Sequence, residues 1–195
     1  MKRAVVSGHC GREEWAEIAS VTWPLMRSYA QRHGLGFHEY VYNTQAGRPA
    51  SWKKLICIAA AMVHADEVLW LDADVVVVDQ SLSIFDAVSL GECIQAMCRL
   101  TDTNGVEHHN AGVWVLRREM LPFLMTAAMD DSCIHHPWWE QQAIRNLIDH
   151  IPTLDLPHEW NVWAGTDPSV VPRFRHACGL HGPGQQLEAV RRWAS

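Results

Sequence analysis

The chain has 195 residues, 48% of them hydrophobic, so we expect one domain over residues 1–195 with a sizeable core. The formal net charge is −6, and the lack of a basic field argues against nucleic acid and anionic membranes as partners. The apolar runs are too short to cross a bilayer and the basic start lacks a signal-peptide pattern, so we expect a cytoplasmic protein without a transmembrane segment.

The cysteines are scattered along the chain and form no Cys-x-x-Cys pair. In a chain without an export signal, we expect them to be reduced thiols, mostly buried. The six positions are Cys10, Cys57, Cys93, Cys98, Cys133 and Cys178. Two histidine pairs, at 108–109 and 135–136, keep a zinc site open as an alternative.

Strand and helix patterns alternate along the chain. In chain order, they predict a strand at 3–9, a helix at 15–33, a strand at 37–42, a helix at 51–64, strands at 67–72, 75–78, 91–98 and 110–118, helices at 118–131 and 136–150, a strand at 173–179 and a helix at 185–195. We expect Pro24 to break the first helix or mark its first turn, Gly34 to end it in a left-handed conformation and Ser51 to cap the next helix. The alternation predicts an α/β fold with a mostly parallel central sheet flanked by helices.

Two carboxylates, Asp72 and Asp74, follow the apolar strand “EVLWL”. In an open α/β sheet, ligands bind beyond the carboxyl ends of the strands, and residues spaced i, i+2 in an extended chain point to the same side. Two carboxylates this close repel unless a cation or water lies between them, and Mg²⁺ or Mn²⁺ suits such oxygen ligands. The Asp-x-Asp pattern alone fits a solvated turn equally well, but the four valines that follow favour a position inside the protein body.

Two further motifs carry weaker signals. Asn110-Ala111-Gly112 leads into an apolar strand, where small residues let a ligand approach the backbone, although an ordinary turn explains the motif too. Glu140 and Gln141 lie in the first turn of a predicted helix, where acidic residues are common because of the helix dipole.

Two histidines, His176 and His181, lie near a glycine-rich turn. A neutral imidazole at a strand end can be a third metal ligand, whereas a lone histidine is usually structural. Backbone N–H groups in such a turn can also cradle a phosphate.

Taken together and in order, these segments resemble the retaining, metal-dependent glycosyltransferases with the GT-A (nucleotide-diphospho-sugar transferase) fold. The likeness is greatest to the galactosyl/xylosyltransferase families of fungi and plants, followed by the glycogenin-like and lipopolysaccharide galactosyltransferases. The matching segments span nearly the whole chain and are “RSYAQRHGLGFHEY”, “SWKKL”, “EVLWLDADVVVVD”, “NAGVWVLRR”, “EQQAI”, “LPHEWN” and “HACG”.

The resemblance implies a role for each matching residue. The ligands of a Mn²⁺ or Mg²⁺ cofactor would be Asp72, Asp74 and His176, with His181 as the second choice for the third ligand. The nucleotide-sugar donor would lie against Ser7, Gly8, Lys54, Ala73, Asn110, Ala111 and Gly112. The residues close to the anomeric carbon would be Glu140 and Gln141. The acceptor side would include Asn161 and Trp163.

Two departures from the family pattern matter. The chain is short for these families, and the usual lysine-containing continuation after “HACG” is replaced by “LHGPGQQ”. Arg191 or Arg192 could substitute for that lysine in holding the leaving phosphate.

The resemblance implies transfer of a sugar from a nucleotide-diphosphate donor, with uridine as the expected base, to a saccharide or other hydroxyl acceptor, with retention. Activity is expected to fall as His176 becomes protonated. Three rivals stay open: a glycoside hydrolase that pairs Asp72 or Asp74 with Glu140, a nucleotidyltransferase, and a non-catalytic sugar- or metal-binding module. Loss of activity on chelation would exclude the hydrolase, and binding of a sugar nucleotide without turnover would favour the binding module.

Overall fold

The computed structural model describes residues 1–42, 48–101, 105–163, 165–180 and 182–195. In this part of the chain, a six-stranded sheet has the strand order β2-β1-β3-β6-β5-β7. Its strands are β1 (Arg3–Cys10), β2 (Gly36–Tyr42), β3 (Glu67–Asp72), β5 (Gln95–Thr101), β6 (Glu107–Arg117) and β7 (Thr153–Asp155). β1 is parallel to β2 and β3, β6 is antiparallel to both of its neighbours, and β7 is parallel to β5. The predicted α/β class is confirmed, with a mixed sheet in which three of the five strand pairings are parallel.

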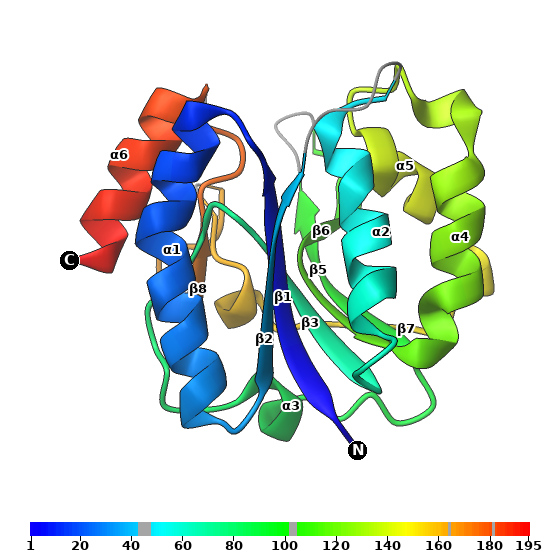
Figure 1. Cartoon of the computed structure of the whole chain (residues 1–195), viewed down its shortest axis with the longest axis horizontal. Coiled ribbons are helices and arrows are strands. Elements are labelled where there is room, and N and C mark those ends of the chain that lie inside the picture. The colour runs from blue at the N-terminus through cyan, green and yellow to red at the C-terminus, as the bar shows by residue number, and fades with distance from the viewer. Residues whose placement is uncertain (43–47, 102–104, 164, 181) are drawn as a thin grey trace.

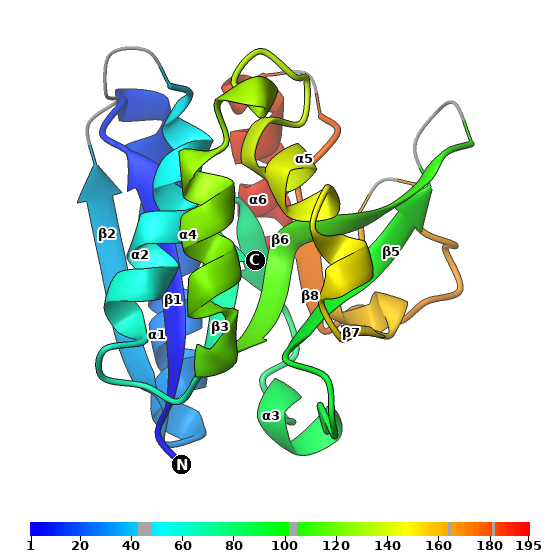
Figure 2. The ribbon, with the colours of Figure 1, turned by 90° about the vertical axis from the view of Figure 1, so that its right-hand side faces the viewer.

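Helices cover both faces of this sheet (Figures 1 and 2). The helices on one face are α1 (Glu13–Arg32) and α6 (Pro183–Ala194). The helices on the other face are α2 (Lys53–Ala61), α4 (Leu121–Met129) and α5 (Trp139–Arg145), and a short helix, α3 (Ile84–Ala87), lies at the end of the sheet near the N-terminus. Single 3₁₀ turns occur at Ala50–Trp52, Arg118–Met120, Asp131–Cys133, Ile148–His150 and His158–Trp160.

The double cover explains why β3 is apolar along nearly all of its length. Val68 and Trp70 pack in a core cluster with α2 and α4, whereas Leu69 and Leu71 pack in a second cluster that includes Tyr29 of α1. A strand buried on both faces needs apolar side chains at consecutive positions, so the alternation seen in half-exposed strands is lost.

Pro24 does not break the first helix, because α1 continues through it. Pro24 and Ser20, one turn earlier, both lie on the exposed side of the helix, so water can bind the carbonyl that loses its hydrogen bond. The expected break is therefore wrong, whereas Gly34, with a φ of 64°, has the predicted left-handed conformation.

Ser51 does not cap a helix that runs to residue 64. It lies inside a 3₁₀ turn that leads directly into α2, and α2 ends at Ala61. The backbone before α2 is therefore already helical, which excludes the extended conformation that a capping serine needs.

A second, two-stranded sheet brings the end of the chain back to the Asp-x-Asp turn. β4 (Val75–Val77) pairs in antiparallel fashion with β8 (Phe174–His176), and Val75 faces His176 in this register. The pairing places His176 directly beside Asp74, although about a hundred residues separate the two in sequence. This long-range contact creates the candidate site.

The cysteines are free thiols, and four of the six are buried, as predicted. None of the helices in the described part of the chain has both the length and the apolar character that a bilayer crossing requires.

Candidate functional site

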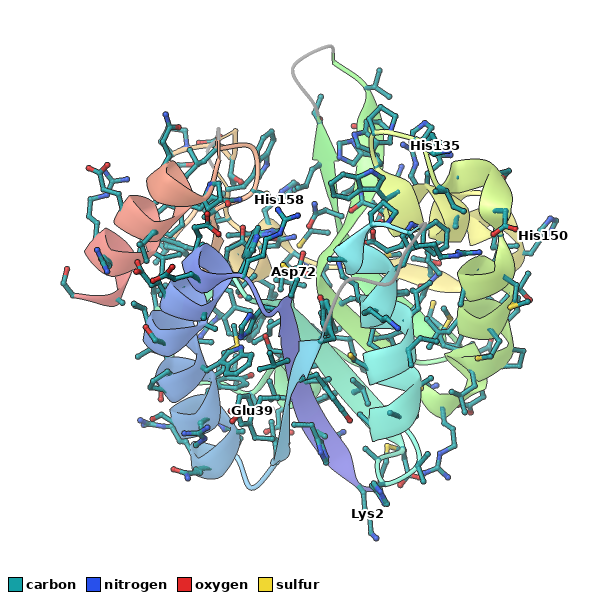
Figure 3. All side chains as sticks on the ribbon, turned by 45° about the horizontal axis from the view of Figure 1, so that its top comes forward. Lys2, Glu39, Asp72, His135, His150 and His158 are labelled. Atoms are coloured by element: carbon teal, nitrogen blue, oxygen red, sulfur yellow. The ribbon has the colours of Figure 1, made fainter. Side chains whose placement is uncertain are left out.

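The chain turns sharply where β3 ends, at Asp72, Ala73 and Asp74. Thr22 of α1 donates a hydrogen bond from Oγ1 to the carbonyl of Ala73 at 2.7 Å, and the backbone N–H of Ala177 donates to the carbonyl of Asp74 at 3.2 Å. Asp72 thus lies between the two helical layers (Figure 3). The two carboxylates converge because of this turn, and not through the strand alternation that the sequence suggested.

Asp72, Asp74 and His176 form a compact cluster, which we call the triad. One ligand atom from each residue lies within 4.8 Å of the other two. Nε2 of His176 is 3.3 Å from Oδ1 of Asp74 and 3.8 Å from Oδ2 of Asp72. Two carboxylate oxygens and one imidazole nitrogen are a donor set that fits Mn²⁺ and similar divalent cations.

A chain of hydrogen bonds fixes the ring of His176. Nδ1 of His176 is 3.0 Å from Oδ1 of Asn161, Nδ2 of Asn161 donates to Oδ1 of Asn110, and the backbone N–H of Gly112 donates to that same oxygen. Because the Asn161 oxygen can only accept, Nδ1 carries the hydrogen and Nε2 faces the two carboxylates. This is the tautomer that a metal-binding histidine needs.

Gly112 lies directly beneath this ring. A Cβ atom at this position would be 2.0 Å from Cε1 of His176, far closer than van der Waals contact. Only a glycine therefore lets the imidazole reach the carboxylates.

The charges of the triad depend on its burial and its neighbours. Burial works to lower the pKa of His176, but Cys178 and Asp74 outweigh it and hold that pKa well above its usual range. Burial works to raise the pKa of Asp72, but Lys54 and His176 outweigh it and the net pKa is lowered. Without a cation, this raised pKa favours the protonated imidazole beside the carboxylates, and a divalent cation could take the place of that proton.

Lys54 of α2 links the triad to Glu140 of α5. Its Nζ is 2.9 Å from Oδ1 of Asp72, 3.2 Å from Oε1 of Glu140 and 3.3 Å from the carbonyl of Ala111. Burial works to lower the pKa of Lys54, but Asp72 and Glu140 raise it above its usual range. Lys54 is thus a buried, charged ammonium between two carboxylates.

Gln141 is attached to the strand that carries Asn110. Its Oε1 accepts a hydrogen bond from the backbone N–H of Ala111 at 3.1 Å, which leaves the amide NH₂ group as its donor. Trp139, two residues before Gln141, has a φ of 42°, and this turn of the backbone begins α5 with Glu140 directed inwards.

These groups line one cavity of about 1040 Å³. Of the residues proposed from the sequence, the lining includes Gly8, Lys54, Asp72, Ala73, Asp74, Asn110, Glu140, Gln141, Trp163 and His176. The structure therefore brings together segments from β1, α2, β3, β6, α5 and β8.

Several predicted positions lie behind the cavity wall. The hydroxyl of Ser7 is fully buried and accepts a hydrogen bond from Nε1 of Trp23, because strand alternation directs it away from the cavity and towards α1. Ala111 and Gly112 also lie outside the lining, where they support Gln141 and His176. Asn161, expected on the acceptor side, is fully buried and supports His176 instead.

The arginines of α6 do not replace the missing lysine. Arg191 pairs with Glu17 of α1 at 3.7 Å, and both Arg191 and Arg192 are exposed away from the cavity. Arg12 and Arg48 are the arginines among the described lining residues. His181, the second choice for the third ligand, lies outside the described residues.

Sequence reasoning missed the residues that support the triad from behind. Thr22 holds the turn, Nε1 of Trp70 donates to Oδ1 of Asp72 at 2.7 Å, and Nε2 of Gln186 donates to Oδ2 of Asp74 at 3.2 Å. Trp70 could have been found, because it precedes Asp72 by two residues on the same strand face. Thr22 and Gln186 carry no local sequence signal.

The histidine pairs do not form a zinc site in the part of the chain that the structure describes. Nε2 of His109 is 2.8 Å from Oδ1 of Asp155, and the ring of His108 stacks on Trp138. Among the residues that the structure describes, the triad is the one cluster in which three metal-binding side chains meet.

The strand order, the helical layers and the carboxylates at the carboxyl end of β3 define a chain with the GT-A glycosyltransferase fold. A glycosyltransferase involved in glycosylation of the major capsid of PBCV-1 has a TM-score of 0.81 and 19% identity, over 98% of this chain and 100% of its own. An active-site mutant of LgtC has a TM-score of 0.69 and 14% identity, over 98% and 95%. The catalytic domain of Drosophila β1,4-galactosyltransferase 7, in complex with xylobiose, has a TM-score of 0.59 and 14% identity, over 98% and 80%.

No family model and no curated protein matches this sequence. At these identities, the similar structures show the fold alone.

Proposed function

We propose that this chain is a glycosyltransferase that moves a sugar from a nucleotide-diphosphate donor to an acceptor hydroxyl. The observation that carries the proposal is the triad itself: two carboxylates and an oriented imidazole inside a large cavity, on a glycosyltransferase fold. Solved relatives of this fold add support. LgtC was crystallised with donor and acceptor sugar analogues, and a mutant of the Drosophila enzyme with manganese, UDP-Gal and xylobiose.

The triad would hold Mn²⁺ or Mg²⁺. The test of fit is the geometry of its donors: Asn161 orients Nε2 of His176 towards Asp72 and Asp74, and Gly112 leaves room for the ring. A divalent cation bound there would act as a Lewis acid for the charge that gathers on the leaving diphosphate. Oδ1 of Asp72 is paired with Lys54, so Oδ2 is the oxygen that faces His176.

The donor would lie across the sheet, with its nucleoside above the end of β1. Gly8, His9, Cys10 and Trp15 line that end of the cavity, and we expect uridine as the base. The sugar would lie near Asn110, with Glu140 and Gln141 beside the anomeric carbon. The carboxylate of Glu140 would stabilise positive charge on the sugar as the bond to the diphosphate breaks.

We propose retention, by attack of the acceptor hydroxyl on the face from which the diphosphate leaves. Gln141 would position the sugar through its amide NH₂ group, since its oxygen is already bound to Ala111. NMR of the first product formed would show the anomeric configuration of the donor, and an inverted centre would contradict this route. We also propose that residues 1–195 act as one glycosyltransferase domain.

The decisive experiment is a thermal-shift screen of UDP-, GDP- and ADP-sugars, each with and without Mn²⁺. We expect one donor to stabilise the chain only with Mn²⁺, because the diphosphate and the triad would share the cation. Asp74→Asn should lower the affinity for Mn²⁺ by at least about 100-fold, as it removes a direct ligand. Asp79→Asn, which alters a carboxylate paired with Arg173, is the matched control and should leave the Mn²⁺ affinity unchanged.

Activity assays run alongside this screen separate the rivals. Hydrolysis of simple glycosides that survives chelation would indicate a glycoside hydrolase. Formation of a sugar nucleotide from a sugar phosphate and a nucleoside triphosphate would indicate a nucleotidyltransferase. Donor binding without transfer, even to water, would indicate a binding module.

A further inference from the structure

Trp139 lies on the cavity wall and is partly exposed. Its exposed fraction is 45%, and in the described part of the chain it is the one Phe, Tyr or Trp residue classed as exposed. A partly exposed aromatic ring on the wall of a large cavity is in a position to contact a ligand.

The backbone at Trp139 is held in an unusual conformation. Its φ of 42° makes it the one non-glycine residue with a positive φ among the described residues. Bulky residues rarely adopt this conformation, and it persists where the surrounding structure enforces it, often at functional sites. In this arrangement Glu140 reaches inwards to Lys54, while Trp139 lies on the cavity wall.

The neighbouring Trp138 is engaged in a different way. His108 stacks on its ring with centroids 4.7 Å apart, and the guanidinium of Arg145 lies 4.5 Å from the same ring centre. Within the described residues, neither an aromatic ring nor a cation covers Trp139. Two side chains therefore hold Trp138, and no such contact holds Trp139 within the part of the chain that the structure describes.

The surroundings of Trp139 indicate the kind of ligand. The same cavity is also lined by Trp15, Tyr42, Trp138 and Trp163, and by the hydrogen-bonding side chains of Arg48, His108 and Gln141. Rings beside polar groups suit a pyranose, which has an apolar C–H face and a rim of hydroxyls. A lipid would need a continuous apolar wall, and a nucleic acid would need a basic field that a chain of net charge −6 lacks.

We infer that Trp139 is the platform on which a saccharide acceptor stacks, next to the reacting centre. The inference rests on the proposed function, since it assigns the acceptor of that reaction. In the strand order, β6 and β5 lie on the far side of Asp72 from β1. An acceptor above Trp139 and β6 would therefore meet the donor sugar from the side opposite the nucleoside. Glu140, the residue after Trp139, pairs with Lys54, and Lys54 pairs with Asp72. These two ion pairs connect the platform to the triad.

The test compares two substitutions at one position. Trp139→Asn removes the ring but keeps a residue that tolerates a positive φ, whereas Trp139→Phe keeps an aromatic face. The probes are the α- and β-methyl glycosides of glucose, galactose, mannose and xylose, titrated by saturation-transfer NMR with diamagnetic Mg²⁺ and UDP present. Met129→Ala, which removes an exposed apolar side chain from α4 outside the cavity, is the control.

We expect at least one glycoside to bind the unaltered chain, and Trp139→Asn to weaken its binding by about tenfold or more. The glycoside affinity of Trp139→Phe should stay within about threefold of that of the unaltered chain, and the affinity of Met129→Ala should equal it. Thermal stabilisation by donor and Mn²⁺ should survive in Trp139→Asn, because the nucleotide lies over β1.

Three results would overturn the inference. These are binding of no glycoside in the panel, equal glycoside affinity in Trp139→Asn and the unaltered chain, and loss of donor stabilisation in Trp139→Asn, which would assign Trp139 to the donor site. Failure of the proposed function has a separate signature. In that case, no sugar nucleotide would stabilise even the unaltered chain in the presence of Mn²⁺.

Discussion

At the scale of single residues, the contact between Gly112 and His176 controls the triad. We predict that Gly112→Ala displaces the imidazole, because the added Cβ would lie 2.0 Å from its Cε1. The clash should destabilise the fold by about 1–3 kcal/mol. Mn²⁺ binding, measured by titration calorimetry, should be lost with it. Gly184→Ala, at a position with no neighbouring atom within 4 Å, is the matched control and should bind Mn²⁺ normally.

Lys54 makes a second residue-scale prediction, because it separates two buried carboxylates. Lys54→Met would leave Asp72 and Glu140 without their shared cation, at a cost of about 3–5 kcal/mol in the free energy of unfolding. Mn²⁺ should restore part of this loss, since it brings positive charge back to Asp72. Melting temperatures with and without Mn²⁺ provide the measurement. A Mn²⁺ shift no larger in Lys54→Met than in Lys53→Met would contradict this account.

The pH dependence of metal binding follows from His176. Its pKa is raised in the metal-free chain, so below that pKa a cation must displace a proton from the imidazole. The apparent Mn²⁺ affinity should then fall about tenfold for each pH unit below this pKa and level off above it. Calorimetry across a pH series would show the slope. The prediction fails if affinity is flat as the solution is acidified, or if His176→Asn shows the same slope.

At the scale of elements, α1 holds the turn that carries the carboxylates. Thr22→Val would keep the shape of the side chain but remove the hydrogen bond to Ala73, leaving a buried carbonyl unpaired at a cost of about 1–3 kcal/mol. We expect a lower melting temperature together with weaker Mn²⁺ binding. Thr22→Ser keeps the hydroxyl and should recover the Mn²⁺ affinity. Equal Mn²⁺ affinities in the two variants would show that the turn does not depend on α1.

Some helices and strands of the molecule can be predicted from the sequence, and others cannot. Local sequence patterns identified β3, the Asp-x-Asp turn and the strand of His176, because each of these is formed by residues that are consecutive in the chain. They failed for Ser51 and Pro24, where the neighbouring 3₁₀ turn and the solvent face of α1 decide the outcome. Local patterns missed β7, because its three residues, Thr153–Asp155, include one apolar side chain and lie between Pro152 and Pro157.

Most of the site geometry lies beyond local patterns. The link from Asn110 through Asn161 to His176, and the position of Gly112 beneath the ring, depend on how distant strands are placed. The spacing of these residues along the chain does not reveal how the distant strands are placed. The family resemblance named Asn110, Lys54 and Glu140 as a group, but only the packed structure shows that Lys54 pairs with Glu140.

At the scale of the whole molecule, the order of strands arranges the cavity. β1 lies on one side of β3, and β6 and β5 lie on the other. Asp72, at the carboxyl end of β3, therefore lies between the part of the cavity above β1 and the part above β6. Structures with under 20% identity share this arrangement over nearly the entire chain. The fold is therefore retained while most residues differ, and the individual roles of Glu140, Gln141 and Trp139 stay predictions.

The pairing of β4 with β8 has a consequence for how the protein is made. During synthesis, Asp72 and Asp74 leave the ribosome long before His176, so a growing chain carries two metal-binding carboxylates without their third partner. The site closes only when residues 174–176 have paired with residues 75–77. Uptake of a cation by all three side chains would therefore report a finished fold, and nascent fragments that end before β8 should bind Mn²⁺ no better than an unstructured peptide containing the same two aspartates.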